Sequence, residues 1–478
     1  MKNLIFTIYF LSLLSYNTHA ASDSAFYDIK LMVQGLKASK ALLGYHLGDQ
    51  NFVVDSAAVD SMMGFVHFRP TKKLAQGIYF VATTEGGILF DFVVTDDKNF
   101  SIITHINAPY DSANVNNSLE NSAFFDYMKI ARQTQYDVIN MRSTLQMLKR
   151  ATKDPQLVAE QERKIYEKIQ SLDTYIGIQI EKYPAQFTSK CLKTLQNVVI
   201  PRDITPYLDD KKPNPAYAFW LRQHFFDNMD YSDDRLLRST FYTAKLSQFI
   251  SQVMPSQPDS VKKYLDFMLE KARSNNLIYY TFTLQYLTKL FDENIDAPQS
   301  DAFLIHLIDN YHHKIGSGTD TATLIRLDYK ANAFRPNLLG NIAPPISLPN
   351  TEGVIQRLSD VKTDYTLVIF YSSLCHHCQE AMPRIKDAVA TTDSTNMTIF
   401  TVCTDGLQAP WKAFLTEMNL SNWTNVITPD IDSDVQKKYA AWKLPVIYLL
   451  DKDKKILAKR LKVENLQNIF KAIKIEKK

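Results

Sequence analysis

The feature that most constrains the fold of this chain is a continuous apolar run that ends in two closely spaced cysteines. Residues 366–371 (TLVIFY) are as apolar as a strand covered on both faces must be. Ser372-Ser373-Leu374 follows, and Cys375-His376-His377-Cys378 then opens a stretch of helical character that reaches about Val389 and contains Pro383. The sequence therefore predicts a buried central strand that leads into a helix whose first turn carries two thiols.

The position of the two cysteines predicts redox chemistry. At a helix N-terminus the dipole and the unpaired N–H groups stabilise a thiolate. Two intervening residues in helical geometry bring Cys378 within disulfide reach of Cys375. Cys375 is predicted to be the exposed nucleophile, and Cys378 to resolve the mixed disulfide, so that the pair forms a redox-active disulfide. His376 and His377 are predicted to donate hydrogen bonds or positive charge to the Cys375 thiolate, which would favour the reduced form.

A zinc site uses the same cysteine spacing but needs two further ligands. Cys403 ends a predicted buried strand at 398–403 and has no cysteine close to it in the sequence. The adjacent His376 and His377 cannot both reach a metal held by the cysteine pair. We therefore predict no metal site and no cofactor, and we expect Cys403 and Cys191 to be unpaired buried thiols. His312 and His313 are likewise expected to be surface or packing residues.

Composition narrows the function further. A length of 478 residues suggests two to four domains. The 54 basic and 51 acidic side chains give a formal net charge of +3, which lacks the clustered basic face that nucleic acid requires. Four cysteines are too few for a scaffold held by disulfides. The chain is predicted to be a globular protein that does not bind nucleic acid.

The first twenty residues have the pattern of an export signal. Lys2 precedes an apolar run at 4–14, and Ala20-Ala21 supplies small residues for cleavage. This run is too short to cross a hydrocarbon core of about 30 Å as a helix, and no later stretch is apolar enough. We predict a signal peptide at 1–20 and a mature chain that does not span the membrane. The expected location is the periplasm of a Gram-negative cell envelope.

The remaining sequence divides into three zones. Residues 22–110 alternate apolar and polar residues in short runs separated by turns, which predicts a small antiparallel β-sandwich. Residues 111–337 have a helical period and predict an all-α domain. Residues 338–478 predict an α/β domain in the order strand, strand, helix, strand, two helices, two strands and helix.

Within the helical zone, Asp154-Pro155 is predicted to cap a helix. Five more helices are predicted at 215–229, 233–254, 258–275, 277–292 and 300–314.

The zone at 338–478 resembles the thioredoxin superfamily, most closely its exported TlpA/ResA-like branch. Three segments carry the likeness: the Gly340–Pro349 entry, the cysteine pair with Pro383, and Lys443–Asp451 around Pro445. The resemblance implies a thioredoxin-like fold with a cis peptide bond at Pro445, which faces the disulfide. It also implies that the backbone at Leu444 pairs with an extended substrate segment.

The same resemblance implies a thiol–disulfide oxidoreductase that acts on thiols and disulfides of exported proteins. Its electron partner would lie in the membrane or the periplasm. The two leading zones resemble, more weakly, β-rich and helical domains of unassigned function that precede such domains in exported bacterial proteins.

Three departures from the family leave the direction of electron flow open. The branch commonly has a glutamate three residues after the second cysteine, where this chain has Ala381 with Glu380 one residue earlier. A shift of one residue turns a helical side chain by about 100°. The buried acid of cytoplasmic thioredoxins would fall at Ile369. The His-His dipeptide also differs from the dipeptides of strong reductants.

Three other functions fit the sequence less well. A peroxidase of the peroxiredoxin type has proline seven residues before its cysteine, where this chain has Val368. A copper chaperone uses a cysteine spacing one residue longer. In the third alternative the N-terminal domains bind a ligand or peptide and the chain is not an enzyme. Replacing Cys375 with serine would abolish dithiol activity if the chain is an oxidoreductase and would leave binding intact if it is a binding protein.

Overall fold

The computed structural model describes residues 26–476 except 152–153, 202–203, 205–206, 210–211, 298, 391–395 and 432. The predicted signal peptide at 1–20 lies outside the described residues. The chain divides into two compact units. The first comprises the residues up to Ser256 together with Glu270–Phe282, and the second comprises Gln257–Leu269 together with Thr283–Lys478.

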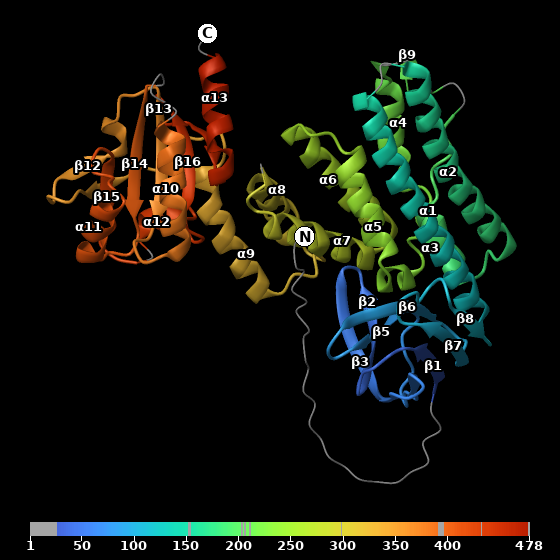
Figure 1. Cartoon of the computed structure of the whole chain (residues 1–478). Coiled ribbons are helices and arrows are strands. Elements are labelled where there is room, and N and C mark those ends of the chain that lie inside the picture. The colour runs from blue at the N-terminus through green and yellow to red at the C-terminus, as the bar shows by residue number, and fades with distance from the viewer. Residues whose placement is uncertain are drawn as a thin grey trace, which may run out of the picture. The chain divides into compact units, whose positions relative to one another are not determined.

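Eight strands open the first unit (blue in Figure 1). They are β1 (Asp28–Gln34), β2 (Lys40–Leu47), β3 (Gln50–Asp60), β4 (Phe65–Phe68), β5 (Gly77–Thr83), β6 (Gly87–Val94), β7 (Asn99–His105) and β8 (Asn114–Asn116). Hydrogen bonds order them β6-β5-β2-β3-β4-β1-β7-β8. The long strand β3 pairs with β2 over most of its length and with β4 at its end. The predicted β-rich N-terminal domain is confirmed.

The alternating sequence pattern reappears in the burial of these strands. Buried and less buried residues alternate along β1 and β7, whereas every residue of β5 is buried. All pairs are antiparallel except β1 with β7, which is parallel and sets Ile29 opposite Phe100. The prediction of an entirely antiparallel arrangement is wrong at this pair. Alternation reports which face of a strand is buried, and it carries no information on the direction of the neighbouring strand.

The helical zone begins after β8. Its α-helices are α1 (Leu119–Ala151), α2 (Pro155–Lys182), α3 (Phe187–Leu195), α4 (Pro215–His224), α5 (Phe241–Gln248), α6 (Pro258–Asn275), α7 (Leu277–Glu293), α8 (Ser300–Leu307) and α9 (Thr321–Phe334). Shorter elements are β9 (Tyr207–Asp209), β10 (Lys212–Pro213), η1 (Asp234–Arg238), η2 (Phe249–Val253), η3 (Ile308–His312) and η4 (Arg335–Asn337). The predicted cap of α2 is confirmed, because the Asp154 side chain accepts a hydrogen bond from the Gln156 amide at 2.8 Å.

The single helix predicted at 233–254 is wrong. The 3₁₀ turn η1 ends at Arg238, Ser239 is extended, and α5 begins two residues later. The Ser239 hydroxyl donates to the Leu236 carbonyl and accepts from the Phe241 amide. Serine side chains compete with helical backbone bonds in this way, so Ser239 interrupts the helix.

The α/β domain occupies the C-terminal part of the second unit (orange to red in Figure 1). Its elements are β11 (Ser347–Pro349), β12 (Ile355–Arg357), η5 (Leu358–Asp360), β13 (Tyr365–Tyr371), α10 (His376–Ala390), β14 (Met397–Cys403), α11 (Gln408–Glu417), β15 (Thr424–Ile427), α12 (Asp434–Lys438), β16 (Val446–Asp451), β17 (Ile456–Lys459), η6 (Val463–Asn465) and α13 (Leu466–Glu476).

Five of these strands form one sheet, in the order β15-β14-β13-β16-β17. The central strand β13 is parallel to β14 and antiparallel to β16. This arrangement confirms the predicted α/β thioredoxin-like fold. The predicted order of elements is wrong at two places, because it lacks one strand of the β11–β12 hairpin and the strand β15. These strands have only three and four residues, too few for a clear sequence pattern.

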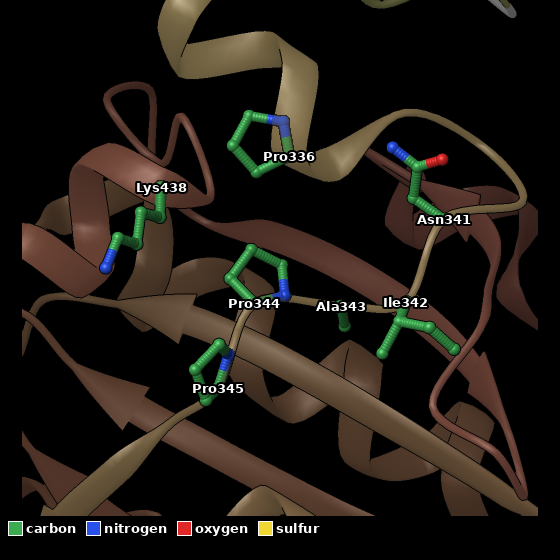
Figure 2. Close-up of a pocket in the computed structure, with 7 residues that line it drawn as sticks. All are labelled: Pro336, Asn341, Ile342, Ala343, Pro344, Pro345 and Lys438. Carbon is green, nitrogen blue, oxygen red and sulfur yellow. The ribbon is translucent and has the colours of Figure 1, made fainter.

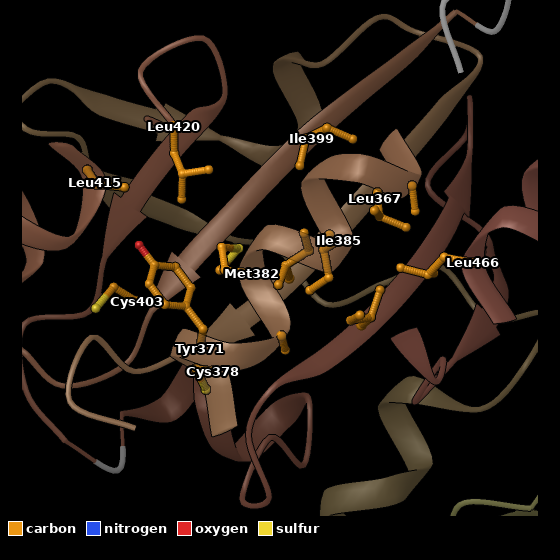
Figure 3. Close-up of a cluster of buried hydrophobic side chains, with 14 of the residues drawn as sticks. Leu367, Tyr371, Cys378, Met382, Ile385, Ile399, Cys403, Leu415, Leu420 and Leu466 are labelled. Atoms are coloured by element: carbon orange, nitrogen blue, oxygen red, sulfur yellow. The ribbon is translucent and has the colours of Figure 1, made fainter. Parts of the chain in front are cut away.

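Both faces of β13 are covered, as its continuous apolar sequence predicts. Val368 and Phe370 belong to one buried cluster, and Leu367 and Ile369 belong to another on the opposite face. Helix α10 packs on the second cluster through Met382 and its neighbours (Figure 3). The core therefore holds both the strand that leads to the cysteines and the helix that begins at them.

Helices α8 and α9 lie in the same compact unit as the α/β domain. Asp301 of α8 is buried and accepts hydrogen bonds from Lys459 and Arg460, which follow each other at the end of β17. Arg460 also lies over the ring of Phe334 in α9. A buried ion cluster thus links these helices to the sheet.

Candidate active site

The two cysteines lie where β13 ends and α10 begins. The Cys375 amide donates to the Ser372 carbonyl at 3.3 Å, and the Cys375 carbonyl accepts from the amides of Cys378 and Gln379 at 3.0 Å. Cys375 therefore directly precedes the helix, and Cys378 lies in its first turn. The strand, loop and helix that the sequence predicts here are confirmed.

The two thiols differ in their surroundings. Cys378 is fully buried in the cluster under α10 (Figure 3), whereas Cys375 is half-buried and packs against this cluster from its margin. Both are free thiols in this structure. Burial raises the pKa of Cys378 to about 12, and the hydrogen bond and charge interaction with Cys375 and the charge of Asp405 act in the same direction. At neutral pH Cys378 is therefore a protonated thiol. Because Cys378 is also buried, Cys375 is the more accessible sulfur of the pair.

A buried carboxylate, that of Asp405, holds the loop before the cysteines. Its Oδ2 atom accepts hydrogen bonds from the Ser373 amide at 2.7 Å, from the Ser373 hydroxyl at 2.7 Å and from the Ser372 hydroxyl at 3.0 Å. Its Oδ1 atom accepts from the Cys403 thiol. Four donors thus converge on one carboxylate immediately beneath the loop that presents Cys375.

The charge state of this carboxylate follows from its donors. Burial alone would raise the pKa of Asp405, but the hydrogen bonds from Cys403, Ser373 and Ser372 outweigh burial and hold the pKa below its usual value. Burial and the hydrogen bond to Asp405 raise the pKa of Cys403. Asp405 is therefore an ionised acceptor, and Cys403 is a protonated, fully buried donor.

The two histidines between the cysteines face solvent. The side chains of His376 and His377 are 77% and 82% exposed. Both approach Glu380, with His376 Nε2 at 3.1 Å from Oε1 and His377 Nδ1 at 3.9 Å from Oε2. No hydrogen bond from either histidine to a cysteine is recorded among the described residues. The structure places Glu380 beside the histidines, and their effect on the Cys375 thiolate stays a prediction.

The segment predicted to position a substrate precedes β16. The Leu444–Pro445 peptide bond is cis, as predicted. Leu444 is partly buried and packs against the same cluster as Cys375. The structure therefore brings Leu444 and Cys375 to the margin of one buried cluster, although they are far apart in the sequence.

Sequence reasoning did not identify Asp405. It looked for an acid at Ile369 and near Ala381, the positions that the family resemblance suggested. A signal was present, because Asp405 comes two residues after the predicted strand that ends at Cys403. β13 and β14 are parallel, so their carboxyl ends meet at one edge of the sheet and set Asp405 beside the loop that follows Tyr371.

Within the described ranges, no three His, Cys, Asp or Glu side chains are arranged to bind a metal ion. A hollow of about 500 Å³ at the entry of the α/β domain is lined by the Asn341–Pro345 segment with Pro336 and Lys438, and contains neither cysteine (Figure 2). None of the helices in the described part of the chain has the length and apolarity to cross a membrane.

Comparisons with known proteins match the α/β domain. Residues 339–459 match the AhpC/TSA family. A thioredoxin-like protein from Bacteroides caccae is 16% identical over 58% of this chain and 98% of its own, with a TM-score of 0.46. The thioredoxin domain of a thiol-disulfide oxidoreductase from Bacteroides vulgatus is 30% identical over 28% of this chain and 96% of its own, with a TM-score of 0.27. A thiol-disulfide oxidoreductase from Bacteroides fragilis is 28% identical over 28% of this chain and 99% of its own, with a TM-score of 0.26. No curated protein matches the chain.

Proposed function

Because residues 339–459 form a thioredoxin-like domain of the AhpC/TSA family, we propose that this chain is an exported thiol–disulfide oxidoreductase that acts through Cys375 and Cys378. The observation that carries the proposal is the difference between the two thiols. Cys375 is half-buried at the start of α10, and Cys378 is buried beside it with a pKa raised to about 12. The Cys375 sulfur can react with a substrate, and the buried Cys378 sulfur can attack the mixed disulfide afterwards.

The exchange proceeds in two steps that balance. The Cys375 thiolate attacks one sulfur of a substrate disulfide, forms a mixed disulfide and expels the first substrate thiolate. Cys378 then attacks the Cys375 sulfur and passes its proton to the departing second substrate thiolate, which leaves as a thiol. The products are the Cys375–Cys378 disulfide and a reduced substrate, and two electrons have passed to the substrate. The reverse sequence oxidises a substrate dithiol.

Other residues position the substrate or adjust the thiolate. The backbone at Leu444, next to the cis Pro445, pairs with an extended substrate segment, and the packing of Leu444 on the same cluster as Cys375 supports this role. His376, His377 and Glu380 form an exposed cluster of ionisable side chains next to Cys375 in the sequence. Water screens any charge on these exposed side chains, so their influence on the Cys375 thiolate is modest.

The surroundings of Val368 disfavour the peroxidase alternative. Val368 lies in the middle of β13, opposite Phe400 on one side and Tyr448 on the other. A proline there would remove a ladder hydrogen bond from a central strand. The loop that a peroxiredoxin builds around its proline has no counterpart at this position.

The proposed partners are thiols and disulfides of exported proteins, with an electron partner in the membrane or periplasm. Export is supported by the order of Lys2, the apolar run at 4–14 and Ala20-Ala21. The mature chain should begin at Ala21 in the periplasm of the expressing cell. Mass spectrometry of its N-terminal peptide checks this, and a retained Met1 would contradict export by this signal.

Trapping of the mixed disulfide tests the function. In a Cys378→Ser variant Cys375 can still form the mixed disulfide, but the resolving attack cannot occur. Substrate proteins should therefore accumulate in disulfide-linked complexes that a reductant separates. A Cys375→Ser variant should form none. Cys191→Ala, which removes a buried thiol in α3, is the matched control and should retain wild-type exchange activity.

Two results together would contradict the enzyme proposal. If Cys378→Ser formed no complexes and the wild-type chain showed no exchange, the enzyme proposal would be wrong. The alternative of a binding protein in the cell envelope, with the N-terminal domains as its binding part, would then stand.

A further inference from the structure

A concave pocket of about 820 Å³ lies in the first compact unit, on the β-rich domain. It is lined by Tyr45 of β2, Tyr79 of β5, the segment at 69–75 and Arg238 of η1, among other residues. The volume falls within the range of about 300–1,000 Å³ that is usual for ligand sites. None of the chemistry assigned to the cysteines involves this pocket.

The pocket is strongly cationic. Arg69, Lys72, Lys73 and Arg238 line it, together with the single carboxylate of Asp55. The four cations exceed the single carboxylate by three positive charges, and the formal net charge of the whole chain is also +3. Within the described structure, none of the four cations forms an ion pair with a carboxylate. Uncompensated charge concentrated in a concave surface attracts anions.

The basic segment is held in place by the strands around it. The Phe26 amide donates to the Pro70 carbonyl at 2.9 Å, and the Tyr79 hydroxyl donates to the Ala75 carbonyl at 2.8 Å. One end of the segment is thus tied to the residues before β1, and the other to β5. Binding to a segment that is already ordered costs less conformational entropy than binding to a free loop.

Arg238 is also fixed. Its Nε atom donates to the Gln76 carbonyl at 2.7 Å. Gly77 lies so close that a Cβ atom there would come within 2.7 Å of the Arg238 Cβ and carbonyl oxygen. This close approach brings η1 against the start of β5 and sets Arg238 at the pocket.

We propose that this pocket binds an acidic segment of a partner polypeptide. Arginine and lysine supply charge-assisted hydrogen bonds to carboxylates, and a guanidinium can hold a carboxylate with two parallel bonds. Apolar residues such as Leu47, Val54 and Leu74 line the pocket together with the cations. Acidic and apolar side chains alternating along a peptide match this lining better than a uniformly charged polyanion does.

Fluorescence anisotropy with the full chain tests the proposal. The probe is a fluorescein-labelled pentapeptide with glutamate at positions 1, 3 and 5 and leucine at positions 2 and 4. A Lys72→Glu/Lys73→Glu double variant should bind it at least tenfold more weakly than the wild-type chain. The matched control is Lys262→Glu/Lys263→Glu, another adjacent pair in α6 with the same charge change, which should bind like the wild type. Cys375→Ser should also bind normally, because the pocket is independent of the redox site.

Several outcomes of this binding experiment would contradict the proposal. Absence of binding, or equal weakening by the two double variants, would show that no local site exists. Equal binding of a peptide with glutamine in place of glutamate would show that charge is not recognised. If heparin bound with the Lys72/Lys73 dependence and the peptide did not, the ligand would be a sulfated polyanion and the peptide assignment would be wrong. Unchanged circular dichroism of both double variants ensures that folding is not the cause.

Discussion

A single buried carboxylate fixes the loop that presents Cys375. Asp405 accepts from the amide and hydroxyl of Ser373 and from the hydroxyl of Ser372, and these donors leave it ionised. Each hydrogen bond to a charged group contributes about 1.5–3 kcal/mol. The position of Cys375, the proposed nucleophile, therefore depends on a residue that contacts neither cysteine of the pair by a recorded hydrogen bond.

Replacing Asp405 with asparagine should loosen this loop. Asparagine keeps the size but loses the charge, so the charge-assisted bonds weaken and residues 372–375 open more often. We expect amide exchange in this segment to become at least about tenfold faster, which corresponds to a loss of about 1.4 kcal/mol. Hydrogen-exchange mass spectrometry measures the change. The control is Asp430→Asn, an exposed acid in a nearby loop, and equal exchange in both variants would contradict the anchoring role.

Individual side chains determine where the helices of this chain begin, are interrupted and end. The Asp154 cap of α2 follows from local sequence, whereas the break at Ser239 depends on a hydroxyl that bonds the backbone on both sides. The strand and helix that carry the cysteines were predictable because β13 is apolar throughout. Asp405 was not predicted, because its role depends on the register of β14 beside β13.

In η3, the buried environment of His312 makes the stability of the chain depend on pH. His312 is buried, and its ring nitrogens lie 2.7 Å from the hydroxyls of Thr288 and Thr319. Burial, followed by the charges of His313 and Arg326, lowers its pKa to about 4. The folded chain therefore keeps His312 neutral at pH values where an unfolded histidine, with a pKa of about 6.5, takes up a proton.

This difference makes stability depend on pH in a defined direction. The stabilisation from neutral His312 is complete above pH 6.5 and is lost as pH falls from about 6.5 to 4, by up to about 3 kcal/mol. A His312→Gln variant should lack this part of the pH dependence. Urea unfolding at pH 7 and pH 4.5 measures it, with His377→Gln, whose side chain is 82% exposed, as the control. If wild type and His312→Gln lost stability equally between the two pH values, the account of His312 would be wrong.

At the scale of the whole molecule, two compact units divide the chain at points that local sequence patterns do not reveal. The three compositional zones were visible in the sequence because alternation and helical period differ. The association of α8 and α9 with the α/β domain was not visible, since it rests on a contact between Asp301 and residues 158 and 159 positions later. Such a pairing is a property of tertiary structure alone.

The buried ion cluster should contribute strongly to the second unit. Lys459 also donates to the Asn337 carbonyl at 2.8 Å, and Asp301 is 1% exposed. An Asp301→Asn change leaves the buried Lys459 without its anion and leaves Arg460 with only the exposed Asp296, which costs about 3–5 kcal/mol. Urea unfolding measures this loss. The control is Asp296→Asn, which pairs with the same Arg460 but is 60% exposed and should cost less than about 1 kcal/mol. Similar losses in both variants would contradict the role of the buried cluster.

The central claim is that Cys375 and Cys378 form a working dithiol–disulfide couple, and the measurement that tests it most directly is their reduction potential. The purified chain is equilibrated with glutathione buffers, and the fraction of linked Cys375–Cys378 is read by mass spectrometry. We expect a reversible two-electron transition. A potential near about −270 mV would assign the chain to the reductants, and one near about −120 mV to the oxidants. The absence of any reversible transition would contradict the claim.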